Sequence, residues 1–247
     1  MRERVAAVLA GGLGTRVSRV TGPSTPKAML PVDGRPFVDY KLLQLAGMGF
    51  TRVLLLTGHA GAPLRDHVAD GSRWPLDIEC VDDGPALLGT GGAVRAVLDR
   101  LPPRFWVTYG DSLVATSPEP VESSLVEPLR GVMTVLDNED RWEPSNVAVE
   151  DGLVVAYEKG APPGTFRSID YGLLLLRGDA FAGHDETPLD LGDVLRELVA
   201  SRRLGAATVT ERLHDVGTEH GWRELDAWAR DTQLWSRLGS AARAART

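Results

Sequence analysis

A glycine-rich stretch near the N-terminus, Leu9–Val17 (LAGGLGTRV), carries the first indication of chemistry. It follows an apolar run and places Gly11, Gly12 and Gly14 within four positions, with Arg16 two residues beyond the last glycine. Glycines let the backbone turn sharply and bring its N–H groups close to phosphate oxygens. Glycines also form ordinary tight turns, so the stretch favours a phosphate site over a plain turn without excluding the latter.

Two familiar nucleotide-binding motifs do not fit this stretch. The dinucleotide fingerprint G-x-G-x-x-G needs a third glycine where the chain has Val17, and an acidic residue at the end of the second strand, which instead continues Thr57-Gly58-His59. A P-loop needs Gly-Lys-Ser/Thr after the glycines, and that triplet is missing. The stretch therefore predicts a phosphate site of another kind.

Lysines are rare in this chain, so the positions that do have a lysine are candidates for a role that needs a compact ammonium group. Of the 27 basic residues only Lys27, Lys41 and Lys159 are lysines, and the two basic side chains are not interchangeable. Lys27 follows Arg16 by eleven residues within the segment PKAMLP, and Lys159 follows Glu158. Lys41 lies in a helical stretch, where we expect it to be a solvated surface residue.

Composition sets limits on the class of protein. The length of 247 residues, with 43% hydrophobic and 25% charged residues, is typical of one globular α/β domain. The net charge of −7 argues against nucleic-acid binding, which needs a basic face. The single Cys80 excludes an internal disulfide framework and a multi-thiolate zinc site. No apolar run approaches a membrane span and no signal sequence is evident, so we expect a cytoplasmic protein without a membrane partner.

The elements that position these residues alternate in the first half of the chain. The expected strands are Val5–Ala10, Val53–Thr57, Asp77–Val81 and Phe105–Tyr109, and the expected helices are Phe37–Leu45, Ala62–Ala69 and Gly91–Leu101. Strands separated by helices predict βαβ units and a parallel sheet. Asp33-Gly34 predicts a tight turn before the first helix. Ligands of such sheets bind beyond the strand ends, which is where the glycine-rich stretch lies.

The second half predicts an antiparallel-rich region. Its expected strands are Val132–Leu136, Asn146–Glu150, Leu153–Tyr157 and Ile169–Leu176, followed by helices at Leu191–Ser201 and Trp222–Leu234 and a frayed tail, Ala241–Thr247. The last helix is expected to dock either on the core or on a partner, so a homo-oligomer stays open.

The sequence GGLGTR followed by Pro26-Lys27 resembles the signature of the sugar-1-phosphate nucleotidyltransferase family. The short heptose-1-phosphate guanylyltransferases and muramate-1-phosphate uridylyltransferases are the most similar in length. These enzymes condense a nucleoside triphosphate with a sugar phosphate and release pyrophosphate. The resemblance implies an α/β fold with a Rossmann-like, mostly parallel mixed sheet of the nucleotide-diphospho-sugar transferase (GT-A-like) type. It also implies one domain, residues 1–247, with a nucleotide part (1–130), a small antiparallel sugar-phosphate part (131–220) and a C-terminal helix and tail (221–247).

The resemblance assigns roles around the triphosphate. The glycine-rich loop wraps the phosphates, Arg16 holds the leaving pyrophosphate, and Lys27 contacts the reacting end. The segment LGTGGA, Leu88–Ala93, resembles the part of the family that lies against the base and ribose; glycines that serve helix packing are the alternative. The implied nucleotide-binding residues are Leu9, Ala10, Gly11, Gly12, Gly14, Thr15, Arg16, Lys27, Asp83, Gly89, Thr90 and Gly91, and the implied catalytic residues are Arg16, Lys27 and Asp111.

A magnesium site follows from the same resemblance. Tyr109-Gly110-Asp111 resembles the family's Gly-Asp, whose aspartate binds Mg²⁺, and Asp215 in HDVGT resembles the second metal ligand. Phosphates repel an incoming anion, and a divalent ion offsets that repulsion. Mg²⁺ typically takes one or two carboxylates together with phosphate oxygens and waters. The alternative for Asp215, the N-cap of the last helix, stays open.

The sugar phosphate is assigned to the second half. Tyr157-Glu158-Lys159 resembles the family's Glu-Lys, whose lysine binds that phosphate. The implied sugar-phosphate-binding residues are Gly110, Asn146, Glu158, Lys159, Asp170, Tyr171 and Gly172. Two segments depart from the family pattern: Ser145–Val149 replaces Y-G-V and Asp170–Gly172 replaces N-A-G. These departures leave the sugar open.

The expected reaction is a single in-line displacement at the α-phosphorus, which depends on positioning and charge stabilisation and needs no nucleophilic side chain. The expected partners are GTP and a heptose or hexose 1-phosphate, with Mg²⁺ as cofactor. Three alternatives remain: a uridylyl- or cytidylyltransferase, transfer to a non-sugar phosphate, and a non-catalytic regulator that binds nucleotide sugars.

Overall fold

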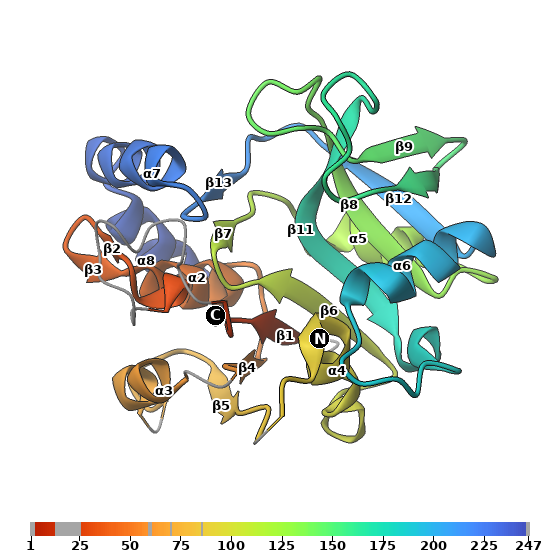
Figure 1. Ribbon diagram of the computed structural model, residues 1–247. Helices are drawn as coiled ribbons and strands as arrows, with labels where there is room; N and C mark the ends of the chain where they lie inside the picture. Colours follow the sequence, from red (N-terminus) through yellow and green to blue (C-terminus); the bar gives the residue numbers. More distant parts are fainter. Residues whose placement is uncertain (1–2, 13–25, 59–60, 70, 85, 246–247) are drawn as a thin grey trace. The chain divides into compact units, whose positions relative to one another are not determined.

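The computed structural model describes residues 3–12, 26–58, 61–69, 71–84 and 86–245 (Figure 1). The chain forms two compact units that alternate along the sequence. Unit 1 comprises Met1–Leu87, Thr108–Leu113 and Leu213–Thr247, and unit 2 comprises Leu88–Val107 and Val114–Arg212.

Three parallel strands, in the order β5-β4-β1, form the sheet of unit 1. They are β1 (Val5–Leu9), β4 (Arg52–Leu56) and β5 (Asp77–Val81). The first four residues of β1 and the last four of β4 are buried, as expected for apolar runs in a parallel sheet covered on both faces. The end of β6 (Arg104–Tyr109) follows β1 in the strand order. The four strands expected in the first half are thus confirmed to within one residue.

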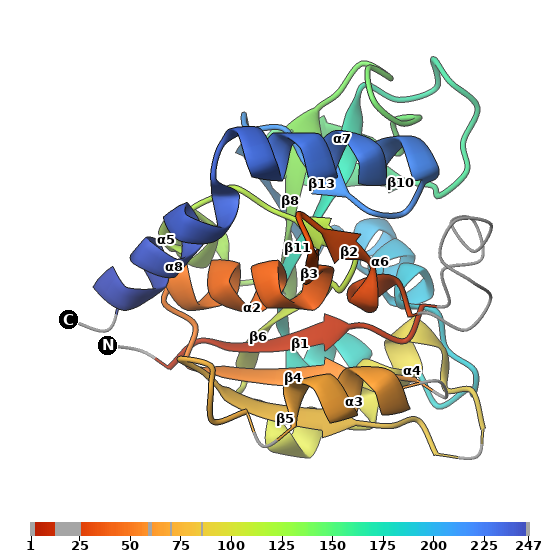
Figure 2. The same cartoon turned by 90° about the vertical axis from the view of Figure 1, so that its left-hand side faces the viewer.

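The helices of unit 1 are α2 (Phe37–Gly47), α3 (Ala62–Val68), α7 (Glu219–Asp231) and α8 (Leu234–Ala244). The first ten residues of α2 are all buried. Figure 2 shows α2 between β1 and the C-terminal helices. α2 and α8 approach closely, because a Cβ on Gly47 would lie 3.0 Å from the Cβ of Ala241.

Short elements complete unit 1. η1 (Lys27–Met29) precedes the hairpin of β2 (Pro31–Val32) and β3 (Arg35–Pro36), whose turn residues have φ angles of 45° at Asp33 and 74° at Gly34. Positive φ at both central residues is the geometry of the tight turn expected from Asp-Gly. β7 (Ser112–Leu113) pairs antiparallel with β13 (His214–Asp215).

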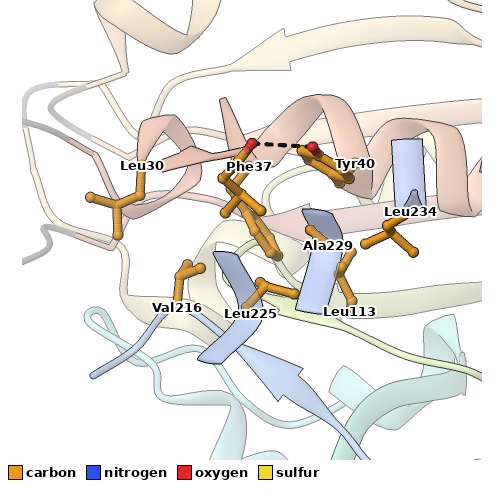
Figure 3. Packing of buried hydrophobic residues seen from close by; sticks show 9 residues of the cluster. Leu30, Phe37, Tyr40, Leu113, Val216, Leu225, Ala229 and Leu234 are labelled. Atoms are coloured by element: carbon orange, nitrogen blue, oxygen red, sulfur yellow. Dashed lines mark hydrogen bonds between the residues drawn. The ribbon is translucent and has the colours of Figure 1, made fainter. Parts of the chain in front are cut away.

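A buried apolar cluster joins the two ends of the chain within unit 1 (Figure 3). Its members are Leu30, Val32, Phe37, Tyr40, Leu113, Val216, Leu225, Ala229 and Leu234. Leu225 and Ala229 are fully buried, so α7 docks on the core of its own unit, one of the two positions expected from sequence.

The strands of unit 2 follow the order β6-β11-β8-β12-β10-β9. They are the start of β6, β8 (Gly131–Asp137), β9 (Val147–Glu150), β10 (Leu153–Tyr157), β11 (Ser168–Arg177) and β12 (Leu204–Val209). The pairs β11–β8, β10–β12 and β10–β9 are antiparallel and β12–β8 is parallel. The antiparallel-rich character expected of the second half is confirmed.

The helical segments of unit 2 are α4 (Gly89–Arg95), η2 (Leu98–Arg100), α5 (Pro118–Ser124), η3 (Gly178–Phe181) and α6 (Leu191–Ala200). No helix in the described part of the chain is long and apolar enough to cross a membrane.

The bounds expected from sequence are wrong for three segments. The helix expected at Gly91–Leu101 is α4, which begins at Gly89 and ends at Arg95, followed by a 3₁₀ turn. The helix expected to run to Leu234 is broken at Gln233, whose φ of 51° is incompatible with a continuous right-handed helix. The tail expected to fray from Ala241 continues as α8 to Ala244.

Candidate active site

The first residues of the glycine-rich stretch follow β1 directly. The amide of Ala10 donates to the carbonyl of Leu56 at 2.9 Å. A Cβ on Gly11 would lie 3.0 Å from both the Cα and the N of Gly58, so two glycine backbones pass each other where a side chain would collide. Gly12 O accepts a hydrogen bond from the amide of Lys27 at 3.3 Å. The rest of the expected loop, Gly14-Thr15-Arg16, lies outside the described residues.

Lys27 is brought to Asp111 by this local structure. Lys27 begins η1, and its Nζ lies 2.8 Å from Asp111 Oδ2. The side chains retain 21% and 29% of their exposure, so both groups remain accessible to solvent. Two residues for which the resemblance implies catalytic roles are therefore in direct contact.

The turn that carries Asp111 is held tightly. The amide of Gly110 donates to the carbonyl of Leu9 at 2.9 Å, and a Cβ on Gly110 would lie 2.9 Å from Ala10 Cα. On the other side, the amide of Val216 donates to the carbonyl of Asp111 at 2.9 Å. Asp111 is thereby fixed between the end of β1 and the segment that follows β13.

Asp215 lies on β13, in register with Ser112 of β7. Its Oδ1 accepts a hydrogen bond from the amide of Gly217 at 2.6 Å. The N-cap of α7 is Thr218, whose Oγ1 accepts from the amide of Gly221 at 3.0 Å. The helix-cap role considered for Asp215 therefore belongs to Thr218.

Gly217 marks the point where these groups converge. A Cβ built on it would lie 3.0 Å from Asp215 Oδ1, 3.7 Å from Lys27 Nζ and 3.9 Å from Asp111 Oδ2. Two carboxylates around one point fit the usual protein contribution to an Mg²⁺ site. Among the described residues no group of three or more His, Cys, Asp or Glu side chains could hold a metal. Mg²⁺ held by Asp111 and Asp215 would need further ligands, which it typically takes from phosphate oxygens and waters.

The expected base-side residue Asp83 is partly exposed after β5. Its neighbour Asp82 has definite partners, since Oδ1 accepts from Thr57 Oγ1 at 2.6 Å and Arg65 binds its other oxygen. The sequence did not indicate this contact between the ends of β4 and β5.

In unit 2, the glycines at the start of α4 pack tightly against the chain around Leu189. Gly89 has a φ of 77°, and a Cβ there would lie 2.3 Å from the carbonyl oxygen of Leu189. The amides of Gly91 and Gly92 donate to that same oxygen at 2.9 and 3.1 Å. Thr90 Oγ1 accepts from the amide of Leu191 at 2.9 Å. The packing alternative is thus sufficient to explain Gly89.

The residues expected to bind sugar phosphate are all in unit 2 apart from Gly110. Asp170 is 8% exposed, and its Oδ1 accepts from the amide of Gly172 at 2.9 Å. Asn146 Oδ1 accepts from the amide of Asp170 at 2.9 Å. Tyr171 is fully buried, its hydroxyl accepts from the amide of Ala115 at 2.9 Å, and burial raises its pKa. These hydrogen bonds fix the backbone of β11 and connect the strand to Asn146 and Ala115.

Glu158 and Lys159 are exposed after β10. Lys159 Nζ lies 3.9 Å from Asp190 Oδ1, and Asp190 caps α6 by accepting from the amide of Gly192 at 2.6 Å. An exposed ammonium beside a partly exposed carboxylate is suited to exchange that contact for a phosphate.

Lys41 corrects a sequence-based expectation. The sequence predicts a surface position for Lys41, but its side chain is 0% exposed. Nζ donates to Thr108 Oγ1 and to Ser112 O, both at 2.9 Å. Burial lowers the pKa of Lys41 to about 7, and the nearby charge of Asp111 acts in the opposite direction. The apolar residues on every side of this helix were the signal that the helix is buried.

The chain is similar in sequence to proteins of known function. Residues 6–159 match the family described as MobA-like NTP transferase domain. The chain is 27% identical to the N-acetylmuramate alpha-1-phosphate uridylyltransferase of Neisseria meningitidis, over 91% of this chain and 97% of that enzyme. It is 27% identical to the D-glycero-alpha-D-manno-heptose 1-phosphate guanylyltransferase of Campylobacter jejuni, over 71% and 77%. A mannose-1-phosphate guanylyltransferase of Mycobacterium tuberculosis is 41% identical over 39% of this chain and 26% of that longer enzyme.

The fold is also shared with solved structures. The inositol-1-phosphate CTP transferase of T. maritima superposes with a TM-score of 0.73 at 20% identity, over 96% of both chains. The Rossmann-like, GT-A-like mixed α/β fold expected from the resemblance is confirmed.

Proposed function

The chain belongs to the family of MobA-like NTP transferase domains, and from this premise we propose that it joins a nucleoside triphosphate to a sugar 1-phosphate and releases pyrophosphate. The proposal rests on one observation: the charged groups of Lys27, Asp111 and Asp215 converge around Gly217, which follows β13. An ammonium and two carboxylates beside a glycine-rich turn are suited to a triphosphate and its metal ion.

In the proposed mechanism unit 1 binds the triphosphate. Backbone amides of Gly11 and Gly12 and the side chain of Arg16 bind phosphate oxygens, and Lys27 stabilises charge on the reacting phosphate. Asp111 and Asp215 would hold Mg²⁺, which, when bound, offsets the negative charge of the triphosphate.

Residues of unit 2 bind the acceptor, which is the sugar 1-phosphate. Lys159 binds the phosphate of the sugar 1-phosphate and so orients the oxygen that attacks the α-phosphorus. Glu158 and the backbone of Gly172 contribute to the same subsite. The proposed division of labour is residues 1–130 for the nucleotide, 131–220 for the sugar phosphate, and 221–247 as the supporting C-terminal part.

For the substrates we favour GTP with a heptose or hexose 1-phosphate. Two relatives with guanylyltransferase names support the base, and their sugars are a heptose and mannose. One relative, aligned over 97% of its own length, is named as a uridylyltransferase, so UTP with an amino-sugar 1-phosphate is the second candidate.

The test is a matrix of five nucleoside triphosphates against heptose, mannose, glucose and amino-sugar 1-phosphates, with pyrophosphate release as the readout. The proposal expects turnover for at least one pair, with GTP and heptose 1-phosphate the best. Asp111→Asn should remove most of this turnover at limiting Mg²⁺. A full matrix without turnover, together with binding of a nucleotide sugar, would instead support a non-catalytic regulator.

A further inference from the structure

Lys41 is the one lysine to which the proposed mechanism gives no role. Its ammonium lies at the inner side of α2 with no solvent exposure and donates to Thr108 Oγ1 and Ser112 O at 2.9 Å each. Thr108 precedes Asp111 by three residues and Ser112 follows it directly. One buried ammonium therefore bridges the two ends of the turn that carries Asp111.

Packing alone does not account for a lysine at this position. Burial of an ammonium is costly unless hydrogen bonds compensate for the lost water. Met would occupy a similar volume without that cost, but it would remove both hydrogen bonds to the turn. Lys41 therefore differs from an apolar residue of similar volume in its two hydrogen bonds, to Thr108 Oγ1 and to Ser112 O, on either side of Asp111.

The position of this turn is passed on to the second carboxylate. Ser112, whose carbonyl Lys41 holds, is in register with Asp215 across the β7–β13 pair. The carbonyl of Asp111 itself accepts from the amide of Val216. A shift of the turn would thus displace Asp111 and Asp215 together.

We propose that Lys41 is a positioning residue for Asp111: by holding Thr108 and Ser112 it fixes the direction in which Asp111 presents its carboxylate to Lys27. Lys41 acts through the turn and touches neither substrate. Its effect on turnover rests on the proposed nucleotidyltransferase function, whereas its effect on the Lys27–Asp111 pair does not.

The presence of only three lysines allows a direct structural readout. Protein labelled with ¹³C at lysine Cε gives three lysine signals, which Lys41→Met and Lys159→Gln assign by loss of one signal each. The proposal expects the Lys27 signal to shift or broaden in Lys41→Met. The matched control is Leu45→Ala, because Leu45 is equally buried in α2 but has no hydrogen-bonding side chain; there the Lys27 signal should stay in place.

Kinetics provide the second readout. Lys41→Met should lower kcat by about tenfold to a hundredfold, the scale of a small misplacement of catalytic groups. The KM for the nucleotide should change by no more than about twofold, because its direct contacts remain. Thr108→Val removes one of the two hydrogen bonds in a nearly isosteric way and should show an intermediate loss of kcat. If Lys41→Met does not fold, Thr108→Val replaces it in the comparison of kcat and of the Lys27 signal with wild type.

An unchanged Lys27 signal in a folded Lys41→Met or Thr108→Val protein would overturn the proposal. Equal losses of kcat in Lys41→Met and Leu45→Ala would do so as well, since they would indicate a general effect on the helix. If the wild-type protein turns over no substrate pair, the proposed function fails while the Lys27 signal still decides the role of Lys41.

Discussion

Lys27 and Asp111 are in contact across 84 positions of the sequence, with Nζ 2.8 Å from Oδ2. Both side chains are partly exposed, and ion pairs of this kind contribute little to stability. Their contact therefore matters chiefly for how charge is arranged beside the glycine-rich stretch.

Lys27→Met should abolish most activity and leave the fold intact. Loss of one positioned charge that stabilises a transition state typically costs about 10²–10³ in kcat. Pyrophosphate release gives the rate, and thermal unfolding should show a Tm close to wild type. Arg237→Met, at an exposed position of α8, is the control and should retain full activity. Comparable rates for the two variants would remove Lys27 from the mechanism.

Asp215→Asn and Thr218→Ala should separate metal binding from helix capping. Asparagine can still accept from the amide of Gly217, so Asp215→Asn should keep the free energy of unfolding and lose activity at limiting Mg²⁺. Thr218→Ala removes the cap of α7 and should cost about 0.5–2 kcal/mol of stability with little change in kcat. Urea unfolding and magnesium titrations of the rate measure the two effects. The reverse pattern would return the capping role to Asp215.

Gly110→Ala should be destabilising, because the added Cβ meets the backbone of Leu9 and Ala10 at 2.9 Å. Overpacking of this kind costs about 1–3 kcal/mol, and the displaced turn should also lower kcat. The control is Gly178→Ala, because a Cβ there has nothing within 4 Å. Chemical denaturation compares the two. If Gly110→Ala is as stable as Gly178→Ala, the turn is not held as tightly as described.

Lys41 should make stability depend on pH. Its pKa is about 7 in the folded protein against 10.5 ordinarily, so between these values the unfolded chain binds a proton that the folded protein does not. Stability should therefore rise with pH across this window, by at most about 1.4 kcal/mol per pH unit. The free energy of unfolding in urea should be measured for wild type and Lys41→Met at pH 7.5 and 9.5. The difference between the two proteins gives the contribution of Lys41, because the contributions of the other titrating groups cancel. Parallel pH profiles would contradict the lowered pKa.

The sequence was sufficient for elements whose signal is local. Continuous apolar runs identified β1 and β4, and Asp33-Gly34 identified the hairpin turn. β12 (LGAATV) was missed because Gly and Ala weaken the strand pattern. The break at Gln233 has no proline or glycine to mark it.

The candidate site was predicted through motifs, while its contacts depend on distant residues. The resemblance identified Lys27, Asp111 and Asp215, and the structure brings them together within unit 1. Lys41 was misjudged because a lone charge in a helix is usually exposed, and its partners are 67 and 71 positions away. The contact of Gly89 with Leu189 could not be predicted from a single sequence either, because the two residues are far apart along the chain.

The alternation of the two units has a consequence for synthesis of the chain. Unit 1 begins at the N-terminus but receives Leu213–Thr247 last, and this segment brings both Asp215 and the core residues Leu225, Ala229 and Leu234. A nascent chain therefore leaves the ribosome with Lys27 and Asp111 long before their third partner exists. A product that terminates before Leu213 lacks one carboxylate of the candidate site and four residues of the apolar cluster, Val216, Leu225, Ala229 and Leu234.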